Sequence, residues 1–166
     1  MKLTPFLLIA SVLLPISQAI SQERVIEETG FGPLRIGMSM AELDALGLDV
    51  RYGEPDQGEV GDYCTETGIG KLDLGAIVEG RVLARVYFWD ATYATGAGIR
   101  VGHTEQQVRD AYGDALTVKP HAYTNGSYLF KLNDQGVGLV FETDRGIVSG
   151  ISIGKLPAIR YIEGCS

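Results

Sequence analysis

LRIGMSMAELDALG at residues 34–47 and IRVGHTEQQVRDAYG at residues 99–113 are two copies of one helix-opening phrase. Gly102 follows Gly37 by 65 residues, and Thr104 follows Ser39 by the same 65. A unit that repeats at a constant offset of this length is typical of a chain built from similar modules. The sequence therefore predicts two modules in tandem rather than one irregular domain.

Each copy carries a capping box at the point where a helix would begin. Ser39 with Glu42 matches S-x-x-E, and Thr104 with Gln107 matches T-x-x-Q. In this motif both side chains accept hydrogen bonds from backbone N–H groups that are otherwise free at the start of the helix. A glycine at the end of each copy is typical of a C-terminal cap. We expect two helices of about two to three turns, which are too short to be stable without a sheet to pack on.

After each helix the hydrophobic pattern changes to the alternation that is typical of strands. The strand-like segments are residues 63–67, 72–78 and 81–89 in the first module and residues 128–132, 137–143 and 147–153 in the second. Turn residues such as Glu79-Gly80 and Asp144-Arg145-Gly146 predict antiparallel hairpins between them. The expected fold class is α+β, with two tandem modules that each pack a short helix on an antiparallel β-meander.

The same signals divide the chain into segments. Gly96 and Gly98 favour a linker between the modules. Apolar side chains that alternate at Ile159 and Tyr161 predict an edge strand in the tail. The predicted segments are a signal peptide (1–19), a first helix-plus-meander module (20–91), a linker (92–98), a second module (99–155) and a C-terminal tail tied by a disulfide (156–166).

The first nineteen residues have the pattern of a secretory signal. Lys2 supplies the charge, Phe6 to Leu14 is the apolar run, and Ser17-Gln18-Ala19 is a small-x-small cleavage site. The apolar run is shorter than the roughly 20 residues that span a bilayer. A bacterial lipid anchor requires a cysteine directly after the cleavage point, and the nearest cysteine in this chain is Cys64. We expect a periplasmic or secreted protein without a membrane anchor.

The charge balance argues against nucleic acid as a partner. The chain has 14 basic and 21 acidic residues, and removal of the signal with Lys2 changes the net charge from −7 to 13 − 21 = −8. Nucleic-acid binding draws much of its affinity from cationic contacts to phosphate. An anionic membrane surface is disfavoured for the same reason.

Cys64 and Cys165 are the two cysteines of the chain. In an oxidising compartment they are expected to form one disulfide, which would fasten the tail to the first module. They lack the C-x-x-C spacing of redox motifs. The expected role of the disulfide is therefore structural.

The GMS phrase, followed by a short helix that ends in glycine, resembles the outer-membrane assembly lipoproteins of the BamE (SmpA/OmlA) type. Two such units in tandem are similar to the β-lactamase inhibitor protein architecture. The resemblance covers Leu34–Gly47 and Ile99–Gly113, with His103 in place of the expected methionine. It implies non-catalytic protein binding on a concave sheet surface. The chain differs in lacking a lipid-anchor cysteine and disulfides within each module.

Residues 81–89 carry the clearest binding signal. Alternation predicts one face with Val82, Ala84, Val86 and Phe88 and an opposite, wetter face with Leu83, Arg85, Tyr87 and Trp89. Tyrosine, tryptophan and arginine are enriched at binding hot spots. A polar, aromatic loop at 119–128 is expected to extend this site, unless Tyr87 and Trp89 pack between the modules. The predicted binding residues are Arg85, Tyr87, Trp89, His121, Tyr123 and Tyr128.

Three alternatives to protein binding follow from the residues. His121, Ser127 and Asp134 could form the triad of a small periplasmic hydrolase. The acidic segment 54–62 could hold calcium, although its spacing is not that of an EF-hand. The aromatic surface could also stack on sugar rings.

We expect a non-catalytic protein that binds another protein. Such a partner could be an envelope or extracellular hydrolase that the chain inhibits, or an envelope protein that it helps to assemble. The histidines and cysteines match no zinc-ligand spacing, and no phosphate-binding loop is present in the sequence. No metal or cofactor is therefore expected.

Overall fold

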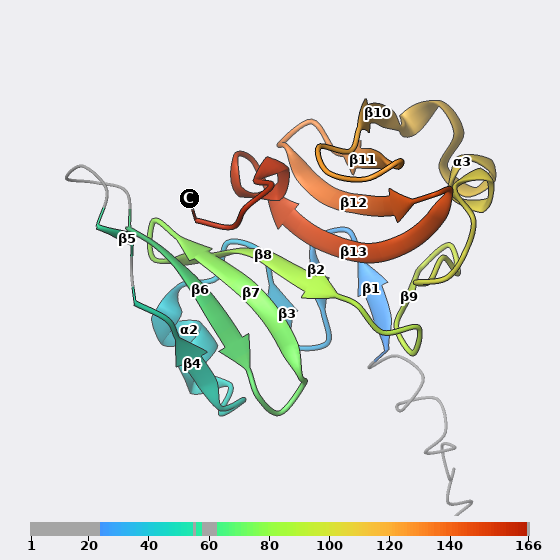
Figure 1. Cartoon of the computed structure of the whole chain (residues 1–166). Helices are drawn as coiled ribbons and strands as arrows, with labels where there is room; N and C mark the ends of the chain where they lie inside the picture. The colour runs from blue at the N-terminus through green and yellow to red at the C-terminus, as the bar shows by residue number, and fades with distance from the viewer. Residues whose placement is uncertain (1–23, 55, 58–62, 166) are drawn as a thin grey trace, which may run out of the picture.

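The computed structural model describes residues 24–54, 56–57 and 63–165, with the backbone alone for 56–57. The predicted signal peptide and most of the acidic segment 54–62 lie outside these residues. The described chain has more strand than helix, and its main feature is a nine-stranded antiparallel sheet (Figure 1). The strands of this sheet are β4 (Val50–Tyr52), β5 (Asp56–Gln57), β6 (Tyr63–Ile69), β7 (Leu74–Glu79), β8 (Val82–Phe88), β10 (Thr117–Pro120), β11 (Ser127–Leu132), β12 (Val137–Asp144) and β13 (Ile147–Lys155).

The order across this sheet is β10-β11-β12-β13-β8-β7-β6-β4, and β5 also pairs with β6. A second, small sheet has the order β3-β2-β1-β9, in which β1 and β9 are parallel. Its strands are β1 (Val25–Glu27), β2 (Gly30–Phe31), β3 (Leu34–Arg35) and β9 (Ala94–Thr95). Strand β9 lies within the segment predicted as a linker.

The helical elements are short. They are the α-helices α2 (Met40–Ala45) and α3 (Glu105–Tyr112) and the 3₁₀-helices η1 (Gly113–Ala115) and η2 (Ala158–Arg160). Both predicted capping boxes are confirmed. The side chains of Ser39 and Thr104 accept hydrogen bonds from the backbone N–H groups of Glu42 and Gln107, and the side chains of Glu42 and Gln107 accept hydrogen bonds from the backbone N–H groups of Ser39 and Thr104. Gly47 and Gly113 have the positive φ angles expected at the helix ends, 62° and 51°. None of the helices in the described part of the chain is long and apolar enough to cross a membrane.

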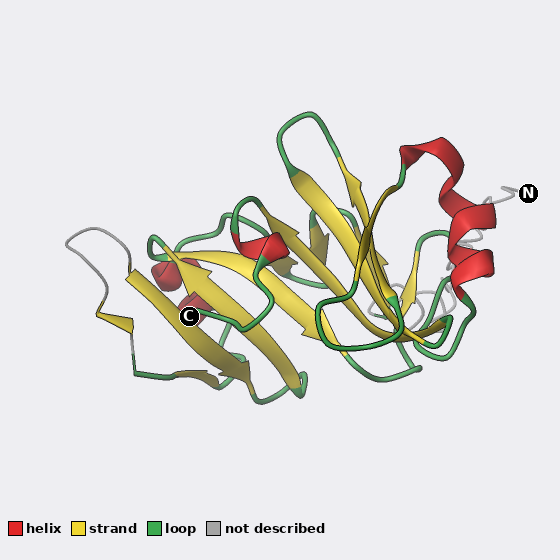
Figure 2. Cartoon of the chain, turned by 45° about the horizontal axis from the view of Figure 1, so that its top comes forward, coloured by secondary structure: helices red, strands yellow, loops and turns green. Residues whose placement is uncertain are grey.

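The predicted fold class, α+β with two tandem modules that each pack a short helix on an antiparallel β-meander, is wrong. The two meanders are found where the alternation predicted them, but β8 pairs with β13 and joins them into one sheet, with Tyr87 opposite Ser152. Each meander alone would leave unpaired backbone groups on these edge strands, and pairing the edges satisfies them. In Figure 2, α3 lies at one end of the strands and α2 lies behind the strands of the first meander.

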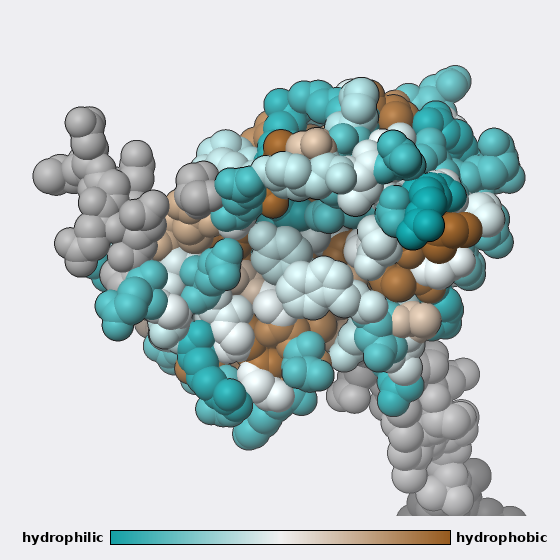
Figure 3. Space-filling view, in the orientation of Figure 1, coloured by the Kyte–Doolittle hydropathy of each residue, from teal (hydrophilic) through white to brown (hydrophobic). Residues whose placement is uncertain are grey.

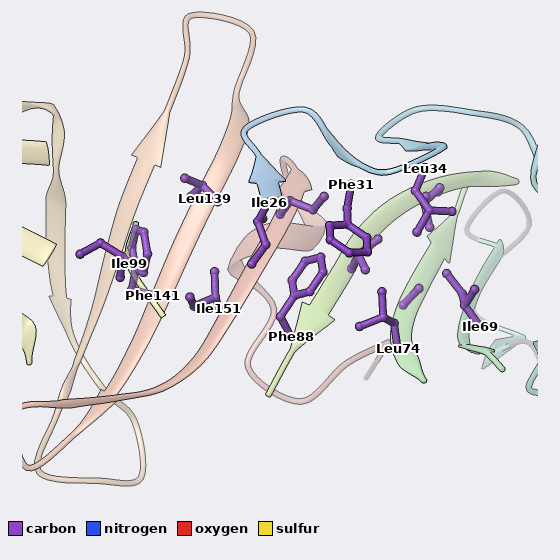
Figure 4. Packing of buried hydrophobic residues seen from close by; sticks show 14 of the residues in the cluster. Ile26, Phe31, Leu34, Ile69, Leu74, Phe88, Ile99, Leu139, Phe141 and Ile151 are labelled. Atoms are coloured by element: carbon purple, nitrogen blue, oxygen red, sulfur yellow. The ribbon is translucent and has the colours of Figure 1, made fainter. Parts of the chain in front are cut away.

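One face of the large sheet holds the main core. The small sheet packs against this face, and Ile26, Phe31 and Leu34 point toward side chains of the large sheet such as Phe88 (Figure 4). Phe31 and Phe88 meet edge to face with ring centroids 5.0 Å apart. Each large apolar side chain buried in this way contributes about 1.5–3 kcal/mol to stability. The small sheet and the two helices, through Leu43 of α2 and Val108 of α3, together cover this face.

A bulge between β7 and β8 changes which side chains of β8 share a face. Ile77 pairs with Arg85, whereas the next residue, Val78, pairs with Leu83, so Ala84 is an extra residue. The predicted alternation is correct from Arg85 to Trp89 and reversed before it. Leu83 packs in the main core, and Ala84 packs on the opposite face with Ile77.

The C-terminal tail, residues 156–165, lies across this opposite face, which we call the outer face (Figure 1). The predicted edge strand is wrong, because the tail forms η2 and turns. Ala158 and Ile159 are consecutive and both buried, since the tail covers two apolar clusters of the sheet with neighbouring side chains. Cys64 and Cys165 are joined by a disulfide that ties the tail to β6.

Candidate functional site

The predicted binding residues of β8 lie on the outer face of the large sheet. Cross-strand partners share a face, so Tyr87 lies beside Gly75 of β7 and Ser152 of β13. The tail covers the part of this face around Ile77 and Arg85. The part around Tyr87 and Trp89 is left open.

Arg85, Tyr87 and Trp89 form a continuous stack along β8. The guanidinium carbon of Arg85 lies 4.4 Å from the centroid of the Tyr87 ring. The rings of Tyr87 and Trp89 are nearly parallel, at 6°, with centroids 5.2 Å apart. One face of a phenol ring accommodates one planar group, so Arg85 and Trp89 lie against opposite faces of Tyr87. Trp89 ends the stack and is 61% exposed.

Glycines on the neighbouring strands make room for the indole. A Cβ at Gly75 would lie 3.0 Å from Cη2 of Trp89, and a Cβ at Gly150 would lie 3.5 Å from its Cδ1. Gly75 and Gly150 come from β7 and β13, on either side of β8. Sequence reasoning missed these residues, because the pairing that brings the two glycines to the same tryptophan is between distant segments.

Arg85 is part of the structure beneath the site rather than an exposed contact. It is 2% exposed, whereas the sequence predicted it on the wetter face. Its guanidinium donates to the backbone oxygen of Tyr161 at 2.7 Å, to Glu142 at 2.9 Å and to Ser152 at 3.2 Å. Arg85 therefore fixes the tail to the sheet and supports one face of the Tyr87 ring.

Two adjoining hollows are lined by Trp89. One opens on the outer face, which faces the viewer in Figure 3, and the other lies at the end of the sheet, where Ile69, Leu74 and Tyr93 also line it. The larger has a volume of about 750 Å³, and the smaller of about 530 Å³. Trp89, Arg51, Gly68 and Gly75 line both. The larger also reaches the tail at residues 162–164. Together they form a continuous depression, with the indole between its two parts.

The predicted residues of the 119–128 loop lie on the same face. Tyr128 pairs with Glu142 in the sheet, and Glu142 is the carboxylate that binds Arg85. The His121 ring stacks on Tyr128 with centroids 4.3 Å apart. The Tyr123 hydroxyl donates to Glu163 of the tail. The six predicted binding residues therefore gather on one face in two groups, which Glu142 and the tail connect.

The tyrosines of this face are held in their neutral form. Burial raises the pKa of Tyr87 above its usual value of 10.0. Burial and then the Glu142 carboxylate raise the pKa of Tyr128. A neutral phenol both donates and accepts a hydrogen bond. These groups thus offer apolar rings with polar ends across the physiological pH range.

The geometry is unfavourable for the alternative hydrolase. Nδ1 of His121 accepts the backbone N–H groups of Tyr123 at 3.1 Å and Thr124 at 3.3 Å, so the neutral ring carries its proton on Nε2 and neither nitrogen is available as a base. Asp134 follows the far end of β11, seven residues from Ser127. At about 3.3 Å per residue, that is roughly 20 Å away. His121, Ser127 and Asp134 do not form a triad.

The described residues also contain no metal site of the usual kind. No group of three or more histidine, cysteine, aspartate or glutamate side chains among them lies close enough to hold an ion. The acidic segment 54–62, which is the calcium alternative, lies mostly outside the described residues.

The comparisons with known proteins concern the fold. No protein-family model matches the chain, and no curated protein matches it in sequence. Among solved structures, the chain is similar to the crystal structure of the uncharacterized protein yfeY from Escherichia coli. The TM-score is 0.52 at 15% identity, over 79% of this chain and 99% of that chain. At this identity the similarity shows a shared fold and nothing about activity or partners.

Proposed function

We propose that the chain is a non-catalytic, periplasmic or secreted binding protein that holds a protein partner on the open part of the outer face. The observation that carries the proposal is the Tyr87–Trp89 stack beside a hollow of about 750 Å³. The indole of Trp89, which is 61% exposed, leaves apolar surface in water, and a partner that covered it would gain the hydrophobic free energy of that surface. Aromatic side chains in such a position dominate the affinity of many protein interfaces.

The support around this stack is rigid, as a binding surface requires. Tyr87 is fixed on one side by buried Arg85, which has hydrogen bonds to three elements. The disulfide between Cys64 and Cys165 holds the tail that forms one wall of the hollow. A surface that is already ordered loses little conformational entropy on binding. The disulfide also favours an oxidising compartment, in agreement with the predicted signal peptide.

Two roles fit such a protein: inhibition of an envelope or extracellular hydrolase, and assistance in the assembly of envelope proteins. Both require only binding. The non-catalytic assignment rests on the unfavourable geometry at His121.

The test is capture of a partner by the full mature chain from the envelope of the native host, followed by affinity measurement with the purified partner. We expect Tyr87→Ala/Trp89→Ala to weaken binding by about 2 kcal/mol or more, which is roughly 30-fold. Ile147→Ala is the matched control, because Ile147 is an exposed apolar residue that lines neither hollow. Unchanged affinity in a folded double variant would place the partner elsewhere and refute the proposal.

A further inference from the structure

The open end of the Arg85–Tyr87–Trp89 stack indicates the chemistry of the partner. One face of the Trp89 indole lies against Tyr87, and the residue remains 61% exposed. The π face of tryptophan carries partial negative charge and binds cations more strongly than the faces of tyrosine or phenylalanine. A positively charged side chain is therefore a suitable next member of the stack.

The molecule already contains one complete example of this arrangement. The Arg85 guanidinium lies over the Tyr87 ring at 4.4 Å and is bound by the Glu142 carboxylate at 2.9 Å. A planar cation is thus held between an aromatic face and an acidic group. An incoming guanidinium on the free face of Trp89 would repeat this arrangement one position further along the stack.

Carboxylates are present where this second arrangement needs them. Asp73 and Asp90 line the smaller hollow beside Trp89, and Glu66 lines the larger. None of these three makes an ion pair within 4 Å among the described residues, whereas the arginines of the two hollows do: Arg51 with Asp49 and Arg85 with Glu142. The hydrogen bonds from Thr92 lower the pKa of Asp90, which keeps it ionised.

The charges around Trp89 disfavour the other classes of ligand. Among the residues that line the two hollows, the arginine pairs leave the carboxylates of Asp73, Asp90 and Glu66 in excess, and the chain as a whole has a formal net charge of −7. Arg24, which lines neither hollow, also acts on Asp90 through its charge. An anionic ligand would be repelled. A neutral sugar could stack on the indole, but it would make no use of the ionised groups.

We propose that the partner presents a basic segment whose arginine side chain stacks on the free face of Trp89 and pairs with Asp73 and Asp90. Arginine fits better than lysine, because its planar guanidinium both stacks on a ring and binds carboxylates through two N–H groups. This inference rests on the proposed function and specifies the chemistry of the same site.

The probe is the peptide Gly-Arg-Gly-Arg-Gly, titrated into the full mature chain with the fluorescence of Trp89 as the readout. Trp89 is the one tryptophan of the sequence, so the signal reports on this site alone. The matched peptide has citrulline, which has the shape of arginine without its charge. We expect saturable binding of the arginine peptide, with a Kd at least tenfold below that of the citrulline peptide. Added salt should weaken the binding.

Asp73→Asn/Asp90→Asn tests the carboxylates. Asn is tolerated at the positive φ of Asp73, 53°, and can still accept the hydrogen bonds from Thr92 at position 90. We expect the Kd of the arginine peptide to rise at least fivefold. The control is Asp110→Asn/Asp114→Asn, which changes the net charge equally at residues that line neither hollow.

Equal binding of the two peptides, or no binding of either, would overturn the basic-segment proposal. Tighter binding of chitotetraose than of the arginine peptide would also overturn it, in favour of a sugar site. These failures are distinct from failure of the proposed function. A captured partner that loses affinity with Tyr87→Ala/Trp89→Ala but not with Asp73→Asn/Asp90→Asn keeps the surface and refutes the basic segment.

Discussion

Arg85 lies in β8 and Trp89 directly follows that strand on the same face of the sheet, yet Arg85 is 2% exposed and Trp89 61% exposed. The difference arises from the tail, which covers the outer face around Arg85 and ends short of Trp89. Apolar and charged groups under the tail have partners within the molecule. Apolar and charged groups of the outer face beyond the tail have fewer partners within the molecule. The outer face therefore divides into a covered half that stabilises the fold and an open half that is available for binding.

Changes in the covered half should lower the free energy of unfolding, whereas changes in the open half should leave it nearly unchanged and alter binding. The tail is the boundary between the two halves, and its attachments are the first place to test the division.

The largest effect is expected from loss of the disulfide. Cys64→Ser/Cys165→Ser opens a loop with a sequence separation of 101 residues, which costs up to about 4.7 kcal/mol in the chain-entropy model. Urea unfolding of the oxidised chain and of the variant measures the difference. Loss of less than about 1 kcal/mol would mean that the packing of Ala158 and Ile159 holds the tail without the disulfide.

Arg85→Ala should have the next largest effect, about 3 kcal/mol, because it removes one partner of a largely buried ion pair. The Glu142 carboxylate and the backbone oxygen of Tyr161 both lose a donor. Urea unfolding is again the measurement. Glu142→Gln is the milder companion, since its amide oxygen can still accept from Arg85. If both variants were as stable as the native chain, Arg85 would not fix the tail.

The short helices, the strands of the two meanders and the shared face of Tyr87 and Trp89 could be predicted from the sequence. The capping boxes at Ser39 and Thr104 depend on side chains three residues away, so the short helices follow from adjacent residues. The strands of the two meanders follow from alternation, which also placed Tyr87 and Trp89 on one face. The stack is in this sense a local property of β8.

The division itself could not be predicted, because it depends on contacts between distant segments. Side-chain alternation identifies β8 and β13 as strands, but it does not indicate which edge strands pair with each other. The bulge at Ala84 exchanges the faces of β8 without changing its composition. The burial of Arg85 depends on where the tail lies. Strands β1, β2 and β3 have only two or three residues each, too few for a pattern to emerge.

Gly75→Ala tests the border of the open half and should have a small effect on stability, below about 1 kcal/mol. The added Cβ would lie 3.0 Å from Cη2 of Trp89, and the exposed indole can turn away to relieve the contact. We expect a shift in the fluorescence maximum of Trp89 and weaker binding of the partner. Gly96→Ala is the control, since a Cβ there meets no atom within 4 Å and Gly96 lines neither hollow. Identical spectra for the two variants would contradict the contact.

Trp89→Ala should have the smallest effect on folding, within about 0.5 kcal/mol, because an exposed side chain contributes little beyond its contact with Tyr87. The same change should abolish binding of the arginine peptide, which fluorescence polarisation of a labelled peptide can measure. Stability and binding would then respond oppositely at Arg85 and Trp89, with only the first required for the fold. A Trp89→Ala chain that unfolds as readily as Arg85→Ala would show instead that the indole belongs to the folded core, and that the open half of the outer face is smaller than its exposure indicates.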